Sequence, residues 1–497
     1  MNKNKQQTNT PSIKKNFFYH SFYQILAMLT PLITAPYLSR VLGPAGIGIH
    51  SYTSTITSYF AIFGCLGIST YGAREIARYR DDKYSSSKIF YELVILKLMM
   101  FAIAIVGFMG LILAEKEYAI YYLALTLILL SNMIDIAWFF KGNEDFKKVS
   151  LTCSGIKIIH LILVITLVRG ENALLKYFII HSGTEFLGSM IMWMFVRKFL
   201  CKVKFEDLEI KRHFKDTFVF FIPTIATSIY YTLDKAMLKW IVGNEAENGY
   251  YEQSRKLIRI MEAIVLSING VMESRMSYLY KQGKNQEMQG RVFTSFNLIF
   301  IIAFPMIFGI SAIANKFVPL FFGDGFEKVI KLIPFMSPLV LITGINNCLC
   351  SHYFNPCGKR RQANRAIIFG VFVNVAFNML LIPFFNSYGA IVASIFAEAI
   401  IMLILFIYSK NFVKFLDVMK YAFTKLFAGI VMFAVVFCLG KFLPGNILSI
   451  LIQITTGAII YFGILFLFQD KLLIKEAKKI ISKIKTRLDK NKAENID

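Results

Sequence analysis

Ionisable side chains lie within long apolar segments of this sequence, where a charge is costly unless it faces a partner or a hydrated cavity. Arg255, Arg259 and Glu262 follow i, i+4, i+7 spacing, which places them on one face of a helix. One interpretation is an ion-pair seam with Glu262 or Asp234. The other, which we favour, is a hydrated cationic cavity for a phosphorylated ligand, because guanidinium and ammonium groups suit phosphate oxygens.

Two lysines and a histidine extend this pattern into earlier segments. Lys97 and Lys157 each lie about 13 Å into an apolar run, at 1.5 Å per residue, which is too deep for easy snorkelling. We expect both to face the interior. His160, one turn after Lys157, is either a proton site or, more simply, a core histidine. The run of serine and threonine over 51–58 predicts either helix contacts or a cavity wall.

Composition fixes the broad class. Of 497 residues, 56% are hydrophobic and 17% are charged, and the mean hydropathy is +0.55, so a soluble domain is excluded. The net charge of +24 does not indicate nucleic-acid binding, because the cations lie between apolar runs. The seven cysteines show no CxxC spacing, and we predict that they are small buried hydrophobic residues. We expect no cleaved signal peptide.

Apolar runs long enough to cross a bilayer predict about fourteen transmembrane helices in an all-α integral membrane protein. The predicted spans are 14–39, 46–69, 88–113, 118–140, 149–168, 174–197, 216–241, 249–277, 293–314, 331–354, 364–384, 387–408, 420–439 and 446–468. Lysine and arginine gather in alternate loops, as in the cluster at 197–215, whereas loops such as 243–248 carry no basic residue. Both termini are therefore expected to be cytoplasmic.

Residues 31–53 and 223–254 resemble each other weakly, with a mid-helix proline, a basic residue and then a glycine in each. We therefore predict two pseudo-repeated six-helix lobes, with a substrate site between them and alternating access. The predicted parts are a cytoplasmic tail (1–13), the first lobe (14–198), a cytoplasmic linker (199–215), the second lobe (216–408), two additional helices (420–468) and a basic cytoplasmic tail (470–497).

No loop is long enough for a soluble catalytic domain, and the sequence contains no Walker A motif, HExxH, paired metal ligands or GxSxG. We therefore expect neither an enzyme nor a cofactor or metal site. The function should lie within the membrane.

The stretch SRVLGPAGIGIHSYTSTITSYFAIFGCLGISTYGAREIAR, residues 39–78, resembles the N-terminal signature of bacterial polysaccharide or oligosaccharide flippases of the multidrug, oligosaccharidyl-lipid and polysaccharide exporter superfamily. Similar elements recur at 135–146, 249–259, 354–365 and 386–398, so the resemblance covers most of the chain. The usual fourteen-helix, two-lobed architecture of this family agrees with the predicted spans.

The resemblance implies a flippase that moves an undecaprenyl-diphosphate-linked repeat unit to the outer leaflet, for capsule, O-antigen or teichoic acid, with glycan assembly proteins as further partners. It places the chain in the bacterial cytoplasmic membrane. The candidate substrate-binding cations are Arg40, Lys157, Lys235, Arg255 and Arg259. The candidate carriers of a coupling proton or sodium ion are Glu185, Asp234 and Glu398. We expect the REIAR box at 74–78 to set helix packing and topology.

Three alternatives stay open. A drug or metabolite antiporter of the same superfamily would favour an anionic cavity, which the lysines and arginines oppose. A membrane polysaccharide polymerase would need larger outer loops than 315–330. A peptidoglycan-precursor flippase is allied in mechanism, and the sequence does not separate it from the preferred function.

Overall fold

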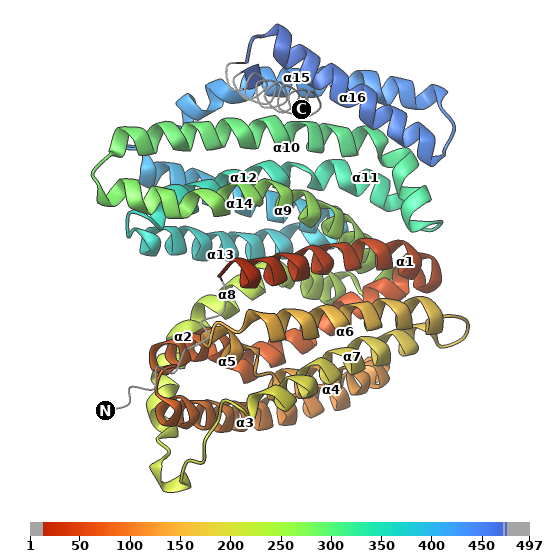
Figure 1. The fold of residues 1–497 in the computed structure, drawn as a ribbon. Helices are drawn as coiled ribbons and strands as arrows, with labels where there is room; N and C mark the ends of the chain where they lie inside the picture. Colours follow the sequence, from red (N-terminus) through yellow and green to blue (C-terminus); the bar gives the residue numbers. More distant parts are fainter. Residues whose placement is uncertain (1–12, 471–472, 475–497) are drawn as a thin grey trace, which may run out of the picture. The chain divides into compact units, whose positions relative to one another are not determined.

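The computed structural model describes residues 13–470 and 473–474, so the predicted tails, 1–13 and 470–497, lie almost wholly outside the described residues. Within the described part the regular structure is helical, with no strand (Figure 1). This confirms the all-α prediction for these residues. The contacts divide the chain into two compact units, with the boundary between Gly249 and Tyr250.

The described residues of the first unit contain ten complete helical elements. They are α1 (Ile13–Cys65), α2 (Ile68–Tyr79), α3 (Lys83–Ala114), η1 (Lys116–Tyr118), α4 (Ala119–Ile134), α5 (Ala137–Gly142), α6 (Phe146–Leu167), α7 (Ala173–Val196), η2 (Phe205–Asp207) and α8 (Ile210–Val242). Helix α4 packs on α7, and α1 packs on α3, α4, α6 and α8. An aromatic core around Phe90, Trp138 and Phe139 joins α3 to α5.

Helix α1 contains the first predicted span, 14–39, and most of the second, 46–69, which ends in α2. The two halves are separated at Gly43, whose φ of 64° and ψ of 179° are essentially restricted to glycine. Pro44 then begins the second half, where its missing N–H costs no helical hydrogen bond. The Leu42-Gly43-Pro44 sequence therefore breaks the rod at the point where the prediction placed a loop.

The fourth predicted span, 118–140, is interrupted. Helix α4 ends at Ile134, Asp135 is extended, and α5 starts at Ala137. The break frees the backbone carbonyl of Asp135, which accepts a 2.7 Å hydrogen bond from the Nζ of Lys97. An unpaired carbonyl is costly inside a membrane, so this donor stabilises the break. Lys97 is only 1% exposed, which confirms that it faces the interior.

The second unit consists of most of α9 (Glu245–Lys281) and all later helices. These are α10 (Asn285–Phe322), α11 (Glu327–Met336), α12 (Pro338–Leu349), η3 (Cys350–Phe354), α13 (Arg360–Phe385), α14 (Ser387–Ser409), α15 (Phe415–Phe442) and α16 (Ile447–Leu467). Helix α13 packs on α14, α10 packs on α15, and α15 packs on α16 (Figure 1).

Each predicted span falls on helix, and eleven helical segments within residues 13–470 are long and apolar enough to cross a membrane. This count takes α1 and α2 as one segment and leaves out α8 and α9. Helices α8 and α9 are long enough, at 33 and 37 residues, but they carry charges such as Asp234, Lys235, Arg255 and Arg259. The protein is therefore a multi-pass membrane protein, whereas the total of fourteen spans and the cytoplasmic termini stay predictions.

Candidate functional site

The first unit contains two adjoining cavities, which share Ile128, Asn132 and His181 as lining residues. The larger, of about 450 Å³, has no charged residue among its described lining residues, and we call it the hydroxyl compartment. Its polar wall comprises Ser54, Ser58, Thr57, Ser69, Thr70 and Asn132. The smaller, of about 340 Å³, is the charged compartment, and its ionisable lining includes Asp135, Lys157 and Glu185.

The wall of the hydroxyl compartment comes mainly from the second half of α1. Ser54, Thr57 and Ser58 line it at spacings of three and four residues, so they share one helix face. The hydroxyls of Thr57 and Ser58 donate to carbonyls of their own helix, at 2.8 and 2.6 Å. Their oxygens still have a lone pair for a ligand. The serine and threonine run over 51–58 thus supplies a cavity wall, one of its two predicted roles.

The charged compartment brings together groups from three helical segments. Asp135 lies at the break between α4 and α5, Lys157 lies on α6, and Glu185 lies on α7. The break in the helix places Asp135 at the cavity. One oxygen of its carboxylate accepts a 3.1 Å hydrogen bond from the backbone N–H of Ala137. One ammonium and two carboxylates face this space. It can therefore bind a group of either charge.

A histidine cluster lies beside the two compartments. The rings of His50 and His160 lie 5.5 and 5.6 Å, centroid to centroid, from the ring of His181. Tyr177 lies 4.7 Å from His50 and stacks on His181. Thr184 and the Nδ1 of His160 are 3.2 Å apart. Three of the six histidines of the chain therefore meet on α1, α6 and α7, and His181 lines both compartments.

Sequence reasoning found only part of this site. It named Lys157, Glu185 and His160, which the structure brings into one region, but it did not assign a functional role to Asn132 or His181. The chain separations between the three histidines follow no helical period. Only the packing of α1, α6 and α7 brings the three histidines together.

The other predicted site residues lie elsewhere. Arg40 is exposed on α1, with Nη1 3.4 Å from the carbonyl oxygen of Pro36. Asp234 and Lys235 are buried on α8, and the carbonyl of Lys235 accepts a 3.0 Å hydrogen bond from Asn248. Arg259 is half-buried on α9. The five predicted cations are divided between the units, with Arg40, Lys157 and Lys235 in the first and Arg255 and Arg259 in the second, and their common substrate role stays a prediction.

The second unit has a polar cluster of its own. Arg255 donates to Glu262 at 2.8 Å, and both side chains are 9% exposed. Thr343 on α12 also lies 3.4 Å from Glu262, and Asn346 donates to the carboxylate of Glu398 on α14 at 2.6 Å. The predicted ion pair of Arg255 with Glu262 is therefore present. A substrate role for Arg255 or a coupling role for Glu398 stays a prediction.

An apolar groove of about 370 Å³ lies between α9, α10, α15 and α16 in the second unit. Methionine, isoleucine and phenylalanine side chains line most of it, and Gly309 and Gly457 widen it because they carry no side chain. Gln453 is the polar residue in its lining, and its side-chain amide donates to the carbonyl of Val436 at 3.0 Å. The groove suits a hydrocarbon chain.

Long apolar helices enclose polar cavities in this protein, which is the architecture of a multi-pass membrane transporter. The polysaccharide biosynthesis protein family matches residues 13–273, which is more than half of the chain, and the chain belongs to this family. This membership bears out the resemblance identified in the sequence.

Two curated relatives are putative O-antigen transporters. The one from Escherichia coli (strain K12) is 23% identical over 413 residues, which are 81% of this chain and 98% of that protein. The one from Shigella dysenteriae is 21% identical over 79% of this chain and 98% of its own length.

Solved structures show the same fold. The lipid II flippase MurJ, in an inward closed conformation, aligns with a TM-score of 0.62 at 16% identity, over 93% of this chain and 100% of that chain. An inward-facing multidrug resistance MATE family transporter of the MOP superfamily aligns with a TM-score of 0.63 at 14% identity, over 82% and 99%. At these identities the likeness concerns the fold alone.

Proposed function

We propose that this protein is a flippase that moves an undecaprenyl-diphosphate-linked oligosaccharide repeat unit across the bacterial cytoplasmic membrane by alternating access. The observation that carries the proposal is the pair of polar compartments inside a helical unit of a polysaccharide biosynthesis family member. A glycan headgroup needs such a hydrated path, because its hydroxyls and charges cannot cross hydrocarbon unpaired. The putative O-antigen transporters among its relatives support the same substrate class.

Each chemical part of the substrate has a match within one of the two units. Uncharged sugar hydroxyls match the serine, threonine and asparagine wall of the hydroxyl compartment, which can both donate and accept hydrogen bonds. A charged substituent, such as a sugar acid or amine, matches the compartment of Asp135, Lys157 and Glu185. The polyprenyl chain stays in lipid and matches the apolar groove beside α15 and α16.

Coupling to a proton or sodium ion is the remaining part of the proposal. Glu185 is the best placed of the three predicted carriers, because it lines a compartment that also contains His181 and Lys157. Binding of a cation at Glu185 would alter the charge balance of the substrate compartment directly. Asp234 and Glu398 stay predictions for the same role.

A cation-coupled drug or metabolite antiporter is a second candidate function, and one observation favours it. Two carboxylates line the charged compartment, so this compartment can also bind a cationic drug. The antiporter would bind its substrate at Asp135 and Glu185. A peptidoglycan-precursor flippase shares the proposed mechanism and differs in the glycan.

Deletion of the gene in its host distinguishes these functions. We expect loss of a surface glycan and accumulation of its completed lipid-linked intermediate in the inner leaflet, measured by leaflet-selective labelling of extracted lipids. Normal surface glycan with raised sensitivity to cationic drugs would point to the antiporter. Arrest of peptidoglycan synthesis with accumulated precursor would point to the allied flippase.

Replacing Lys157 by methionine is expected to lower glycan export by about tenfold to one hundredfold. Loss of a charged hydrogen-bonding partner costs about 1.5–3 kcal/mol. The measurement is surface glycan per protein inserted in the membrane. Lys420→Met is the matched control, because Lys420 is exposed and pairs with Asp417 of the same helix at the surface. Normal export by Lys157→Met at wild-type membrane levels would remove Lys157 from the site.

A further inference from the structure

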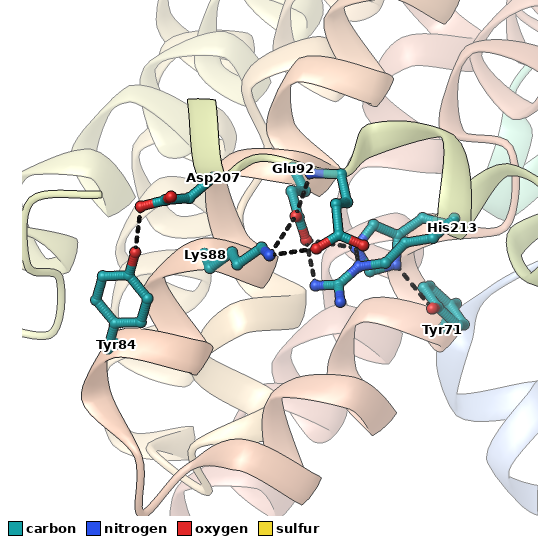
Figure 2. Close-up of polar contacts among 8 residues, drawn as sticks. Tyr71, Tyr84, Lys88, Glu92, Asp207 and His213 are labelled. Carbon is teal, nitrogen blue, oxygen red and sulfur yellow. Dashed lines mark hydrogen bonds and ion pairs between the residues drawn. The ribbon is translucent and has the colours of Figure 1, made fainter. Parts of the chain in front are cut away.

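One face of α3 binds the segment that connects α7 to α8, residues 197–209. Tyr84 donates to Asp207 at 2.6 Å, and Lys88 pairs with Glu209 at 2.7 Å (Figure 2). Ser87 accepts a 3.0 Å hydrogen bond from the backbone N–H of Cys201. These α3 positions repeat at spacings of three and four residues, so they share one face of the helix. The connecting segment is therefore attached to α3 at several points, while residues 204–207 between them are exposed.

Glu92 fixes the end of this attachment. Its carboxylate is fully buried, and it accepts hydrogen bonds from the backbone N–H of Glu209 at 2.6 Å and from Arg212 at 2.7 Å (Figure 2). The Nε2 of His213 lies 2.7 Å from the same carboxylate. Separation of these groups would leave a carboxylate buried without its donors, which is strongly unfavourable.

His213 links this carboxylate to α2. Its Nδ1 lies 2.8 Å from the hydroxyl of Tyr71 (Figure 2). The imidazole of His213 therefore bridges the carboxylate of Glu92 and the hydroxyl of Tyr71. Outside the helices, hydrogen bonding and charge from Lys88 hold the pKa of Glu209 below its ordinary value, which keeps this carboxylate ionised for its pair. The first turn of α8 is thus held by α2 and α3.

The other end of α8 is attached to the same unit. Trp240 donates to the hydroxyl of Tyr52 on α1 at 2.8 Å, and Tyr52 donates to Glu115 at 2.8 Å. Just beyond α8, Glu245 accepts a 2.6 Å hydrogen bond from Tyr118 and contacts Lys239. Both ends of α8 are therefore anchored to helices of the first lobe.

We propose that α8, although it contains the first span of the predicted second lobe (216–408), is a permanent part of the first lobe and moves with it during transport. The connecting segment is then a fixed attachment, and the moving joint between the halves lies in α9 beyond Gly249. The boundary between the two compact units, at Gly249 and Tyr250, supports this position. The inference rests on the proposed transport cycle for its functional meaning, whereas the attachment itself is independent of the substrate.

The chain offers its own cross-link for the test. The Sγ of Cys201 lies 3.4 Å from the Oγ of Ser87, so Ser87→Cys places two thiols close enough for a disulfide after a small adjustment. We expect the disulfide to form in native membranes and the oxidised variant to transport at the rate of the reduced one. The control is Ser87→Cys/Cys201→Ser under the same oxidant.

Two outcomes would overturn the proposal. One is inactivation of oxidised Ser87→Cys that a reductant reverses, because the connecting segment must then detach in each cycle. The other is failure of the disulfide to form, scored by thiol labelling, because the two positions then do not stay together.

A rescue arm tests the function of Glu92 directly. We expect reduced Glu92→Gln/Ser87→Cys to melt at a lower temperature than reduced Ser87→Cys and to transport several-fold more slowly, because one amide oxygen replaces two carboxylate oxygens. Oxidation should restore both properties, because a covalent bond replaces the lost contacts. No recovery on oxidation would show that Glu92 does more than attach α8. If Glu92→Gln does not insert, Tyr84→Phe/Lys88→Met weakens the same attachment and takes its place.

The melting and cross-linking measurements separate this proposal from the proposed function. If wild-type protein moves no glycan, the flippase assignment fails, but cross-link formation and thermal rescue still report on the attachment of α8. If glycan transport is confirmed and the cross-link abolishes it, the attachment proposal alone fails.

Discussion

Replacing Gly48 by alanine is expected to destabilise the protein by about 1–3 kcal/mol and to abolish most transport. A Cβ atom on Gly48 would lie 1.7 Å from the backbone carbonyl oxygen of Glu245. The opposing Gly249 is equally confined, since its Cβ would lie 2.0 Å from the carbonyl oxygen of Pro44. Backbone forms both obstacles, so the start of α9 must move away from α1. That shift would also disturb the contact of Tyr118 with Glu245.

The measurements for this variant are its amount in the membrane, its thermal unfolding in detergent and glycan export. Gly183→Ala on α7 is the matched control, because a Cβ there meets no atom within 4 Å. Alanine is also the better helix former, so the control should be neutral or slightly stabilising. Wild-type unfolding and export by Gly48→Ala would show that the two helices are not held this close in the membrane.

The helices were predictable because the bilayer imposes a length. A segment that crosses hydrocarbon needs about 20 apolar residues, and each run of that kind in the sequence falls on helix in the structure. The break at Gly43 was predictable too, because a Leu-Gly-Pro sequence stops a helix and restarts it. Local sequence carried this information, so no tertiary knowledge was needed.

The polar residues Ser131, Asn132 and Asp135 lie at this break, but polar residues also lie in the unbroken helix over 51–58, so they did not predict the break at Asp135. Its stabilising donor, Lys97, lies on another helix 38 residues away. The sequence indicated only that the charged side chain of Lys97 had to face the interior. Sequence reasoning could therefore predict that Lys97 is buried, but it could not identify the carbonyl that Lys97 binds.

The attachment of α8 shows a different limit. Arg212 was counted among the basic residues that indicate a cytoplasmic loop, and Glu92 lies only a few residues inside a predicted span. Neither position alone suggests a partner 120 residues away, yet the two groups lie 2.7 Å apart. Topology rules use the number of cations in a loop, and they carry no information on which acid a given cation meets.

The role of Arg255 is where the two sequence interpretations differ most, and substitution of the pair separates them. Arg255→Met is expected to cost about 3–5 kcal/mol, because it leaves the carboxylate of Glu262 buried and unpaired. The double variant Arg255→Met/Glu262→Met removes both charges and should recover the thermal stability and membrane level of the wild type, since apolar replacement of a whole buried pair is often neutral.

Glycan export by the double variant then decides between structure and substrate binding. We expect the double variant to insert normally and still to fail in export, because a phosphorylated substrate would lose the Arg255 guanidinium. The surface pair Glu287 and Arg291, also 2.8 Å apart but far more exposed, supplies the control: Arg291→Met should cost less than about 1 kcal/mol and leave export intact. Full export by the stable double variant would establish that Arg255 serves only to neutralise Glu262, and the phosphate-binding cation would then have to be sought at Lys157 or Arg259.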